Sequence, residues 1–125
     1  MNIPIAFTSN PDLSAAGTSL VGYIDIDYNS LVRVLGEPYR QADGYKVDAE
    51  WVIHFHDGTI ATIYNYKDGI NYLGPEEGTP TEQIRDWHIG GETERAAALV
   101  HQLFAPILSA PPIGTHASYG RISEE

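Results

Sequence analysis

The chain has 125 residues, no cysteine, and a formal net charge of −10 from 17 acidic and 7 basic side chains. Its length predicts one domain with a real hydrophobic core, and 42% hydrophobic residues exclude a disordered polymer. The absence of cysteine excludes disulfides, thiolate zinc sites and cysteine nucleophiles, and the acidic balance argues against direct binding to nucleic acid.

The first part of the chain predicts an arm, a strand and a short helix. Residues 1–17 are rich in Pro, Ser, Asn and Gly and lack periodicity, which is typical of an extended arm or loop. Residues 19–28 have a period of two, so they predict a strand with one wetter face. Residues 31–35 then predict a short helix that Asp27 or Asn29 can cap.

The next segment predicts a β-hairpin, the centre of the expected sheet. Residues 45–56 and 59–66 are rich in β-branched and aromatic side chains, and the pair Asp57-Gly58 separates them. This dipeptide tolerates the positive φ values of a tight type I′ turn. One face of the hairpin should meet a helix and the other should stay partly open. On the first strand, one face carries Trp51, Ile53 and Phe55.

The remaining segments predict a loop, a third strand and the main helix. Residues 67–80 form a Gly-rich loop whose length indicates function or an interface. Residues 82–89 predict a short third strand that the Gly-Gly pair at 90–91 breaks. Residues 94–104 predict the main helix, which Pro106 stops or kinks.

These elements together predict an α+β fold. It consists of a small antiparallel sheet centred on the hairpin, packed by one main helix, which Thr93 is expected to cap, and one short helix. The expected domain covers residues 18–105, between the arm at 1–17 and an irregular tail at 106–125. Open sheet edges and an exposed aromatic face favour self-association into a homo-oligomer.

No residue pattern argues for catalysis, a metal or a cofactor. His54 and His56 could reach one metal from a shared strand face, but no third ligand stands at a diagnostic spacing. Asp25 and Asp27 are more typical of a wet edge or a helix cap than of acid–base chemistry. Walker, dinucleotide, nucleophile-elbow and metalloprotease motifs do not occur. We therefore expect a protein that is not an enzyme.

The hairpin, the loop and the third strand combine many aromatic residues with a few cations. The aromatic residues are Trp51, Tyr64, Tyr66, Tyr72 and Trp87. The cations are Lys46, Lys67 and Arg85. Part of the aromatic set must be core, but a ring face can also stack on any nucleobase. Cations among aromatic rings indicate a small anion rather than a long polymer.

Several motifs, in a fixed order, resemble a family of small bacteriophage and prophage proteins. They are residues 36–38 (GEP), 44–51 (GYKVDAEW), 57–67 (DGTIATIYNYK), 71–74 (NYLG) and 86–91 (DWHIGG). The resemblance covers residues 18–104. Some members are similar to the Thoeris anti-defence proteins of the first type. Those proteins act as sponges that bind cyclic ADP-ribose-type signals from bacterial TIR enzymes and do not cleave them.

The resemblance implies an oligomeric α+β protein with pockets for a nucleotide-like ring. The expected stacking residues are Tyr64, Tyr66 and Trp87. The residues expected to meet the phosphates are Lys67, Arg85 and His88. The first alternative is an acidic interaction module that inhibits or decoys a host protein. The second is a small hydrolase that uses His54, His56 and His88.

The expected location is the cytoplasm of the host bacterium. No apolar run approaches the roughly 18 residues that span a membrane. The first residues lack a basic region followed by an apolar core, so no signal peptide is expected.

Overall fold

The computed structural model describes residues 6–10, 13–15, 17–40 and 46–108. Its strands are β1 (Phe7–Ser9), β2 (Ser19–Asp25), β3 (Tyr39–Arg40), β4 (Ala49–Phe55), β5 (Ile60–Tyr64) and β6 (Asp86–Gly91). Its helices are α1 (Tyr28–Leu35), α2 (Ile70–Leu73), the 3-10 turn η1 (Thr81–Gln83) and α3 (Glu94–Leu108).

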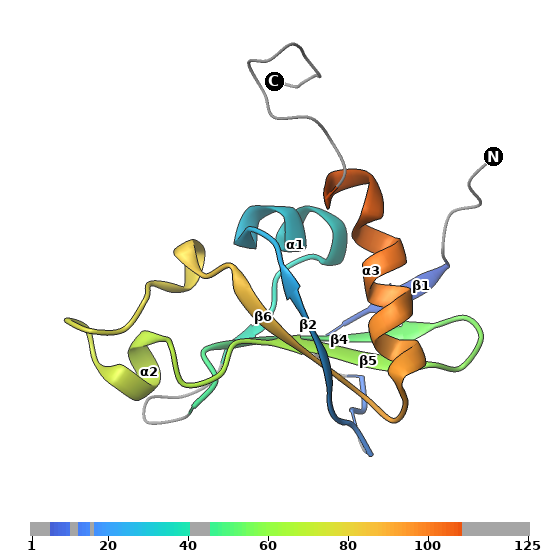
Figure 1. Cartoon of the computed structure of the whole chain (residues 1–125), viewed down its shortest axis with the longest axis horizontal. Helices are drawn as coiled ribbons and strands as arrows, with labels where there is room; N and C mark the ends of the chain where they lie inside the picture. Colours follow the sequence, from blue (N-terminus) through green and yellow to red (C-terminus); the bar gives the residue numbers. More distant parts are fainter. Residues whose placement is uncertain (1–5, 11–12, 16, 41–45, 109–125) are drawn as a thin grey trace, which may run out of the picture.

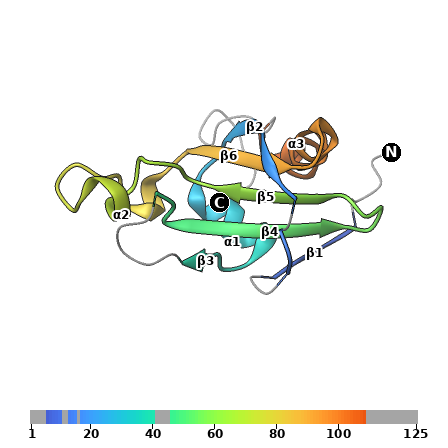
Figure 2. The same cartoon turned by 90° about the horizontal axis from the view of Figure 1, so that it is seen from below.

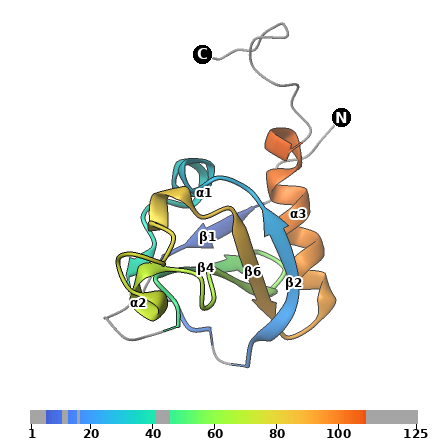
Figure 3. The same cartoon turned by 60° about the vertical axis from the view of Figure 1, so that its left-hand side comes forward.

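In this part of the chain the strands form one antiparallel sheet in the order β1-β4-β5-β6-β2, with β3 also paired to β4. Helices α1 and α3 lie on the same face of the sheet, as Figures 1 and 3 show. The predicted α+β fold, with one long and one short helix against a sheet, is therefore confirmed.

The hairpin of β4 and β5 is present, but its turn differs from the prediction. The loop has three residues, 56–58, because Gly58 N–H donates to the Phe55 carbonyl at 3.0 Å and Phe55 N–H donates to the Thr59 carbonyl at 2.9 Å. Gly58 has a φ of 94°, whereas Asp57 keeps a negative φ. A type I′ turn needs positive φ at two residues, so that prediction is wrong. The Asp57 carboxylate instead accepts from Thr59 N–H at 2.9 Å.

The glycine pair at 90–91 does not break a strand, because both residues belong to β6. Each glycine is needed for close packing. A Cβ on Gly91 would run into the methyl group of Ala96 in α3, and a Cβ on Gly90 would run into the Thr62 hydroxyl on the other face. The missing side chains therefore let the helix and the neighbouring strand approach the β6 backbone.

Part of the predicted N-terminal arm belongs to the sheet. Strand β1 pairs with β4, with Phe7 opposite Phe55. The described residues between β1 and β2, including 13–15, lie on the side of the sheet opposite the helices, below the sheet in Figure 1. There the His54 Nε2 lies 2.8 Å from the Ser14 carbonyl oxygen. Residues 1–5, 11–12 and 16 lie outside the described part of the chain.

Both main helices have a predicted cap, but α1 begins at Tyr28, within the strand predicted at 19–28 and before the helix predicted at 31–35. Asp27 caps α1, since its Oδ2 accepts from Ser30 N–H at 3.1 Å. Thr93 Oγ1 accepts from Arg95 N–H at 3.3 Å at the start of α3. Helix α3 continues through Pro106 to Leu108, so the domain extends past the predicted boundary at 105. Pro106 has no backbone N–H to donate, so the last turn of α3 lacks one helical hydrogen bond. The tail from 109 onward lies outside the described residues.

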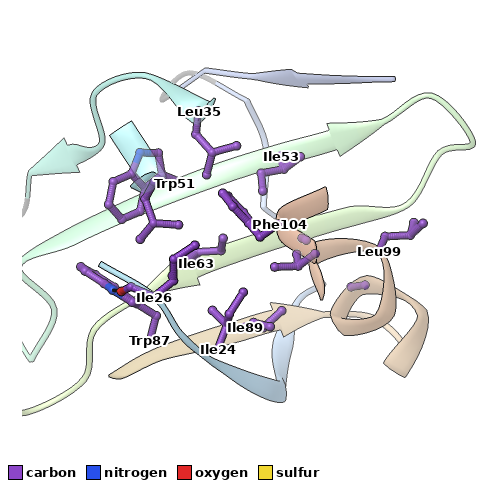
Figure 4. Packing of buried hydrophobic residues seen from close by; sticks show 14 of the residues in the cluster. Ile24, Ile26, Leu35, Trp51, Ile53, Ile63, Trp87, Ile89, Leu99 and Phe104 are labelled. Atoms are coloured by element: carbon purple, nitrogen blue, oxygen red, sulfur yellow. Dashed lines mark hydrogen bonds between the residues drawn. The ribbon is translucent and has the colours of Figure 1, made fainter. Parts of the chain in front are cut away.

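The hydrophobic core fills the space between the sheet and the two helices, as Figure 4 shows. Trp51, Ile53 and Phe55 all enter it, so the predicted shared face of β4 is confirmed. The same face of β5 contributes Ala61 and Ile63. Within the described residues, no helix has the length and apolar character needed to cross a membrane.

Candidate functional site

The two tryptophans belong to the core. Trp51 is 2% exposed and Trp87 is fully buried, and their ring centroids lie 5.3 Å apart in an edge-to-face contact. The Trp87 Nε1–H donates to the Ile26 carbonyl at 3.0 Å, and the Trp51 Nε1–H donates to the Gly36 carbonyl at 2.8 Å. The structure thus corrects the prediction for Trp87, because a buried ring offers no face for stacking on a base.

A second aromatic group lies on the opposite face of the sheet, which Figure 2 shows from below. His88 is its centre, with ring centroids at 4.9 Å from Tyr23, 5.4 Å from Tyr64 and 5.6 Å from Tyr66. We call these four residues the His88 cluster. Strand register produces it, because Tyr64 on β5 and Tyr23 on β2 stand directly opposite His88 from its two sides.

The His88 cluster is accessible to a ligand. Tyr23 is 62% exposed and Tyr66 is 41% exposed, while Tyr64 and His88 are half-buried. Burial raises the pKa of the Tyr64 phenol, and the nearby Glu50, Tyr23 and Tyr66 raise it further. The phenol therefore stays neutral and can donate a hydrogen bond at neutral pH. The cluster offers several ring faces on which a planar group can stack.

Lys67 places a positive charge beside the cluster. Its Nζ lies 5.4 Å from the ring centroid of Tyr66 and 5.7 Å from that of Tyr72. Lys67 also has a φ of 63°, and among the described residues no other non-glycine residue has a positive φ. Its N–H donates to the Lys46 carbonyl at 2.7 Å, which holds this conformation. Conformations of this kind are enriched at functional sites.

The buried side chains of Asn65 and Asp48 form hydrogen bonds that hold the chain on either side of Lys67. Asn65 is fully buried, and its Oδ1 accepts from the N–H groups of Asp48 at 2.8 Å and Ala49 at 3.1 Å. Its Nδ2 donates to the carboxylates of Asp48 at 2.9 Å and Asp68 at 3.0 Å. Every polar atom of the Asn65 side chain is therefore bonded, so the amide fixes the start of the loop to β4.

Asp48 extends this network to helix α2. Its Oδ2 accepts from Asn71 N–H at 3.1 Å, in the first turn of that helix. Gly69, the residue before α2, has no side chain that could accept a hydrogen bond from the first turn of the helix. A Cβ at Gly69 would run into the Asp48 carboxylate. Asp48 and Asn65 were not predicted from the sequence as positioning residues. The available signal was an amide at 65, in phase with the core-facing side chains of Ala61 and Ile63.

Arg85, the second predicted phosphate contact, is engaged elsewhere. Its Nε donates to Asp25 Oδ1 at 3.0 Å, and both side chains are more than half exposed. No contact joins Arg85 to the His88 cluster within the described chain. The structure brings Tyr64, Tyr66, Lys67 and His88 together and leaves Arg85 outside the group.

The histidines predicted as metal candidates do not converge. The alternation that would place both on one strand face ends at Phe55, so His56 lies in the hairpin loop. His54 is engaged with the Ser14 carbonyl. Across the residues described, no three His, Asp or Glu side chains gather as a metal site requires.

A shallow polar hollow lies at the tip of the hairpin, next to the start of α3. Its lining is Asp57, Gly58, Thr59, Ile60, Glu92 and Thr93. The Asp57 carboxylate there accepts from Arg95 at 2.7 Å. None of the predicted site residues lines this hollow, so the candidate site remains the open surface around His88.

A comparison of the chain with models of known protein families finds no match, and a comparison with curated proteins finds none either. The family resemblance of the motifs therefore remains a hypothesis, and the functional argument depends on the arrangement of side chains.

Proposed function

We propose that this protein is a non-enzymatic binding protein that sequesters a nucleotide-like immune signal of the cyclic ADP-ribose type. In this proposal a phage encodes it and it acts in the cytoplasm of the host bacterium. The observation that carries the proposal is the His88 cluster, an exposed aromatic group with the Lys67 ammonium at its border.

The cluster has the two chemistries that such a ligand needs. The rings of Tyr23, Tyr64 and Tyr66 can stack on a base, since each aromatic face accepts a π surface. Lys67 supplies the cation for the phosphates. Tyr23 takes the stacking role that Trp87 was expected to have, and Arg85 has no role in this revised site.

The net charge of −10 limits what can bind. A long polyanion would be repelled by the acidic surface as a whole, whereas a small ligand meets only the local field near Lys67. One ammonium is little for a diphosphate, so we propose that two or more copies of the chain contribute to each bound ligand. This requirement joins the expected homo-oligomer to the binding function.

The experiment is a bind-and-release assay. The protein is incubated with a cyclic ADP-ribose isomer, separated from free ligand and heat-denatured, and the released compound is identified by mass spectrometry. Sequestration predicts that the ligand disappears from solution and returns intact. A ligand that never binds would remove the proposal, and a ligand that returns cleaved would make the protein an enzyme.

A matched pair of variants locates the site. Lys67→Gln and Arg85→Gln each remove one positive charge, so their effects on the overall field are alike. The proposal expects a roughly tenfold or greater loss of affinity for Lys67→Gln and nearly unchanged affinity for Arg85→Gln. Equal losses in the two variants would place the phosphates elsewhere.

A second candidate function is an acidic interaction module that binds a host protein. It is favoured by apolar side chains that stay exposed outside the cluster. Among the described residues they are Leu20, Tyr39, Ile70, Tyr72, Leu73 and Leu108. Under this alternative, a protein from host extract is retained by the wild type, and its retention does not change when Lys67 is replaced or a nucleotide is added.

A further inference from the structure

Glu50 stands in line with the His88 cluster. It lies on β4 directly opposite Tyr64, which is itself opposite His88, so the three side chains point to the same face of the sheet. The complete row crosses five strands, from β3 through β4, β5 and β6 to β2. Its members are Tyr39, Glu50, Tyr64, His88 and Tyr23.

The Glu50 carboxylate is half-buried and has no fixed partner among the residues that the structure describes. Within the described part of the chain, no hydrogen bond or ion pair engages its oxygens. Burial raises the pKa of this carboxyl, and no neighbouring donor offsets that effect. A polar group that loses water without gaining a hydrogen bond is costly. The side chain therefore has an unused capacity to accept hydrogen bonds at the border of the aromatic surface.

Glu50 and Lys67 adjoin the cluster through different rings. Glu50 is the cross-strand neighbour of Tyr64, whereas Lys67 lies against Tyr66. The surface thus offers an acceptor, a group of aromatic rings and a cation. A simple anion gains nothing from Glu50, and a simple cation is repelled by Lys67. A nucleotide whose base carries an N–H donor satisfies all three groups together.

We propose that Glu50 selects the base of the ligand, by accepting a hydrogen bond from the exocyclic amino group of an aminopurine such as adenine. The inference rests on the proposed nucleotide-binding function and adds the chemical requirement on the base. A purine that lacks the amino group leaves the carboxylate unpaired and presents only ring nitrogen acceptors to it. Such a base is rejected because acceptor faces acceptor.

The test compares two ligands that differ by one amino group, ADP and purine riboside 5′-diphosphate. Affinities are measured by calorimetry at pH 7, together with the chemical shifts of the His88 ring protons. Wild type is expected to bind ADP roughly tenfold or more tightly than the analogue, which is the usual effect of a hydrogen bond to a charged group.

Three variants test whether Glu50 causes the preference for ADP. Glu50→Leu removes the acceptor and is expected to bind the two ligands about equally. Glu50→Gln keeps a weaker, neutral acceptor and is expected to retain part of the preference. Glu82→Gln is the control, since it makes the same charge change at an exposed residue that pairs with Arg40 at 3.6 Å. It should keep the full preference for ADP.

The results that overturn the inference are distinct from those that remove the proposed function. Equal affinities of wild type for the two ligands, a preference that survives Glu50→Leu, or no binding of ADP at millimolar concentration each overturn it. Displacement of ADP by choline also overturns it, because the cluster and Glu50 would then form a cation site. The bind-and-release assay with a cyclic ADP-ribose isomer decides the proposed function separately.

Discussion

The indole rings of Trp51 and Trp87 meet edge to face, with centroids 5.3 Å apart, in the middle of the core. This contact joins β4 to β6 across β5 on the face that the helices cover. Tyr64 of β5, His88 of β6 and Tyr23 of β2 point the other way. The sheet thus has an indole pair in the core, where it stabilises the fold, and a phenol–imidazole cluster on the opposite face that remains available for binding.

Trp87→Ala is expected to lower the free energy of unfolding by about 3–5 kcal/mol, because it leaves a large cavity and removes the hydrogen bond to Ile26. Urea denaturation followed by circular dichroism measures the change. Tyr23→Ala, at a side chain that is 62% exposed, should change stability by only about 0.5 kcal/mol. Similar losses in both variants would contradict the division into core and surface sets.

Asn65→Asp is expected to lower the free energy of unfolding by at least about 3 kcal/mol. The substitution replaces the donating Nδ2 by an oxygen that faces the carboxylates of Asp48 and Asp68. Asn29→Asp, at an exposed position in the first turn of α1, is the matched control and should be neutral or slightly stabilising. A tolerated Asn65→Asp would show that the network does not hold the loop.

Glu50→Gln is expected to stabilise the protein at pH 7 and to have little effect near pH 4. Burial raises the pKa of Glu50 above its ordinary value of 4.5, so the folded state favours the protonated form. The stability linked to this group is fully present below the unfolded pKa and is lost as pH rises through the folded pKa. Denaturation curves of wild type and variant across pH 4–8 check this sign. A variant that is less stable than wild type at pH 7 would indicate that the ionised carboxylate has a partner.

Asp57 is expected to titrate with a pKa of about 2, well below its usual value of 3.8. The Thr59 hydrogen bonds contribute most of this decrease, and the Arg95 guanidinium adds to it. The stability linked to Asp57 is present above the unfolded pKa and is lost as pH falls through about 2. Carbon NMR of the side-chain carboxyl measures the titration. In Arg95→Gln the pKa should rise but remain below 3.8, and an unchanged pKa would exclude a contribution from Arg95.

Gly91→Ala is expected to destabilise the protein by about 1–3 kcal/mol, because the new methyl group would run into Ala96 in α3. A double-mutant cycle with Ala96→Gly tests the cause, since removing the facing methyl group should recover part of the loss. Additive effects of the two substitutions would mean that the contact between β6 and α3 does not explain the glycine.

Much of the fold follows from local patterns. The alternation in β2, the apolar and aromatic runs around Asp57-Gly58 and the apolar stripe of α3 are features of neighbouring residues. Each of these elements is present, although β2 ends at Asp25 instead of residue 28 and α3 continues to Leu108. The errors at the glycine pair and in the N-terminal arm are at positions where distant contacts override local preference. Gly90 and Gly91 remain in β6 because Thr62 and α3 occupy the positions where their side chains would lie. Phe7 belongs to the predicted arm but pairs with β4.

The candidate site was predicted only in part, for a similar reason. Tyr64, Tyr66, Lys67 and His88 come from β5, the residues after it and β6, and the family resemblance already implied all four as site residues. Tyr23 and Glu50 are brought to the same face by the register of β2 against β6 and of β4 against β5. The alternation of apolar and polar residues within one strand does not predict which other strand lies beside it.

The sequence by itself determined where the main strands and the two main helices form and which residues share a face of each predicted strand. A period of two states that neighbouring side chains point to opposite sides, but it does not state which side the helices will cover. Only the tertiary structure decided this. Helices α1 and α3 pack over the face that carries Trp51 and Trp87, so both indole rings are buried in the core. The tyrosines around His88 lie on the opposite face and stay accessible to a ligand.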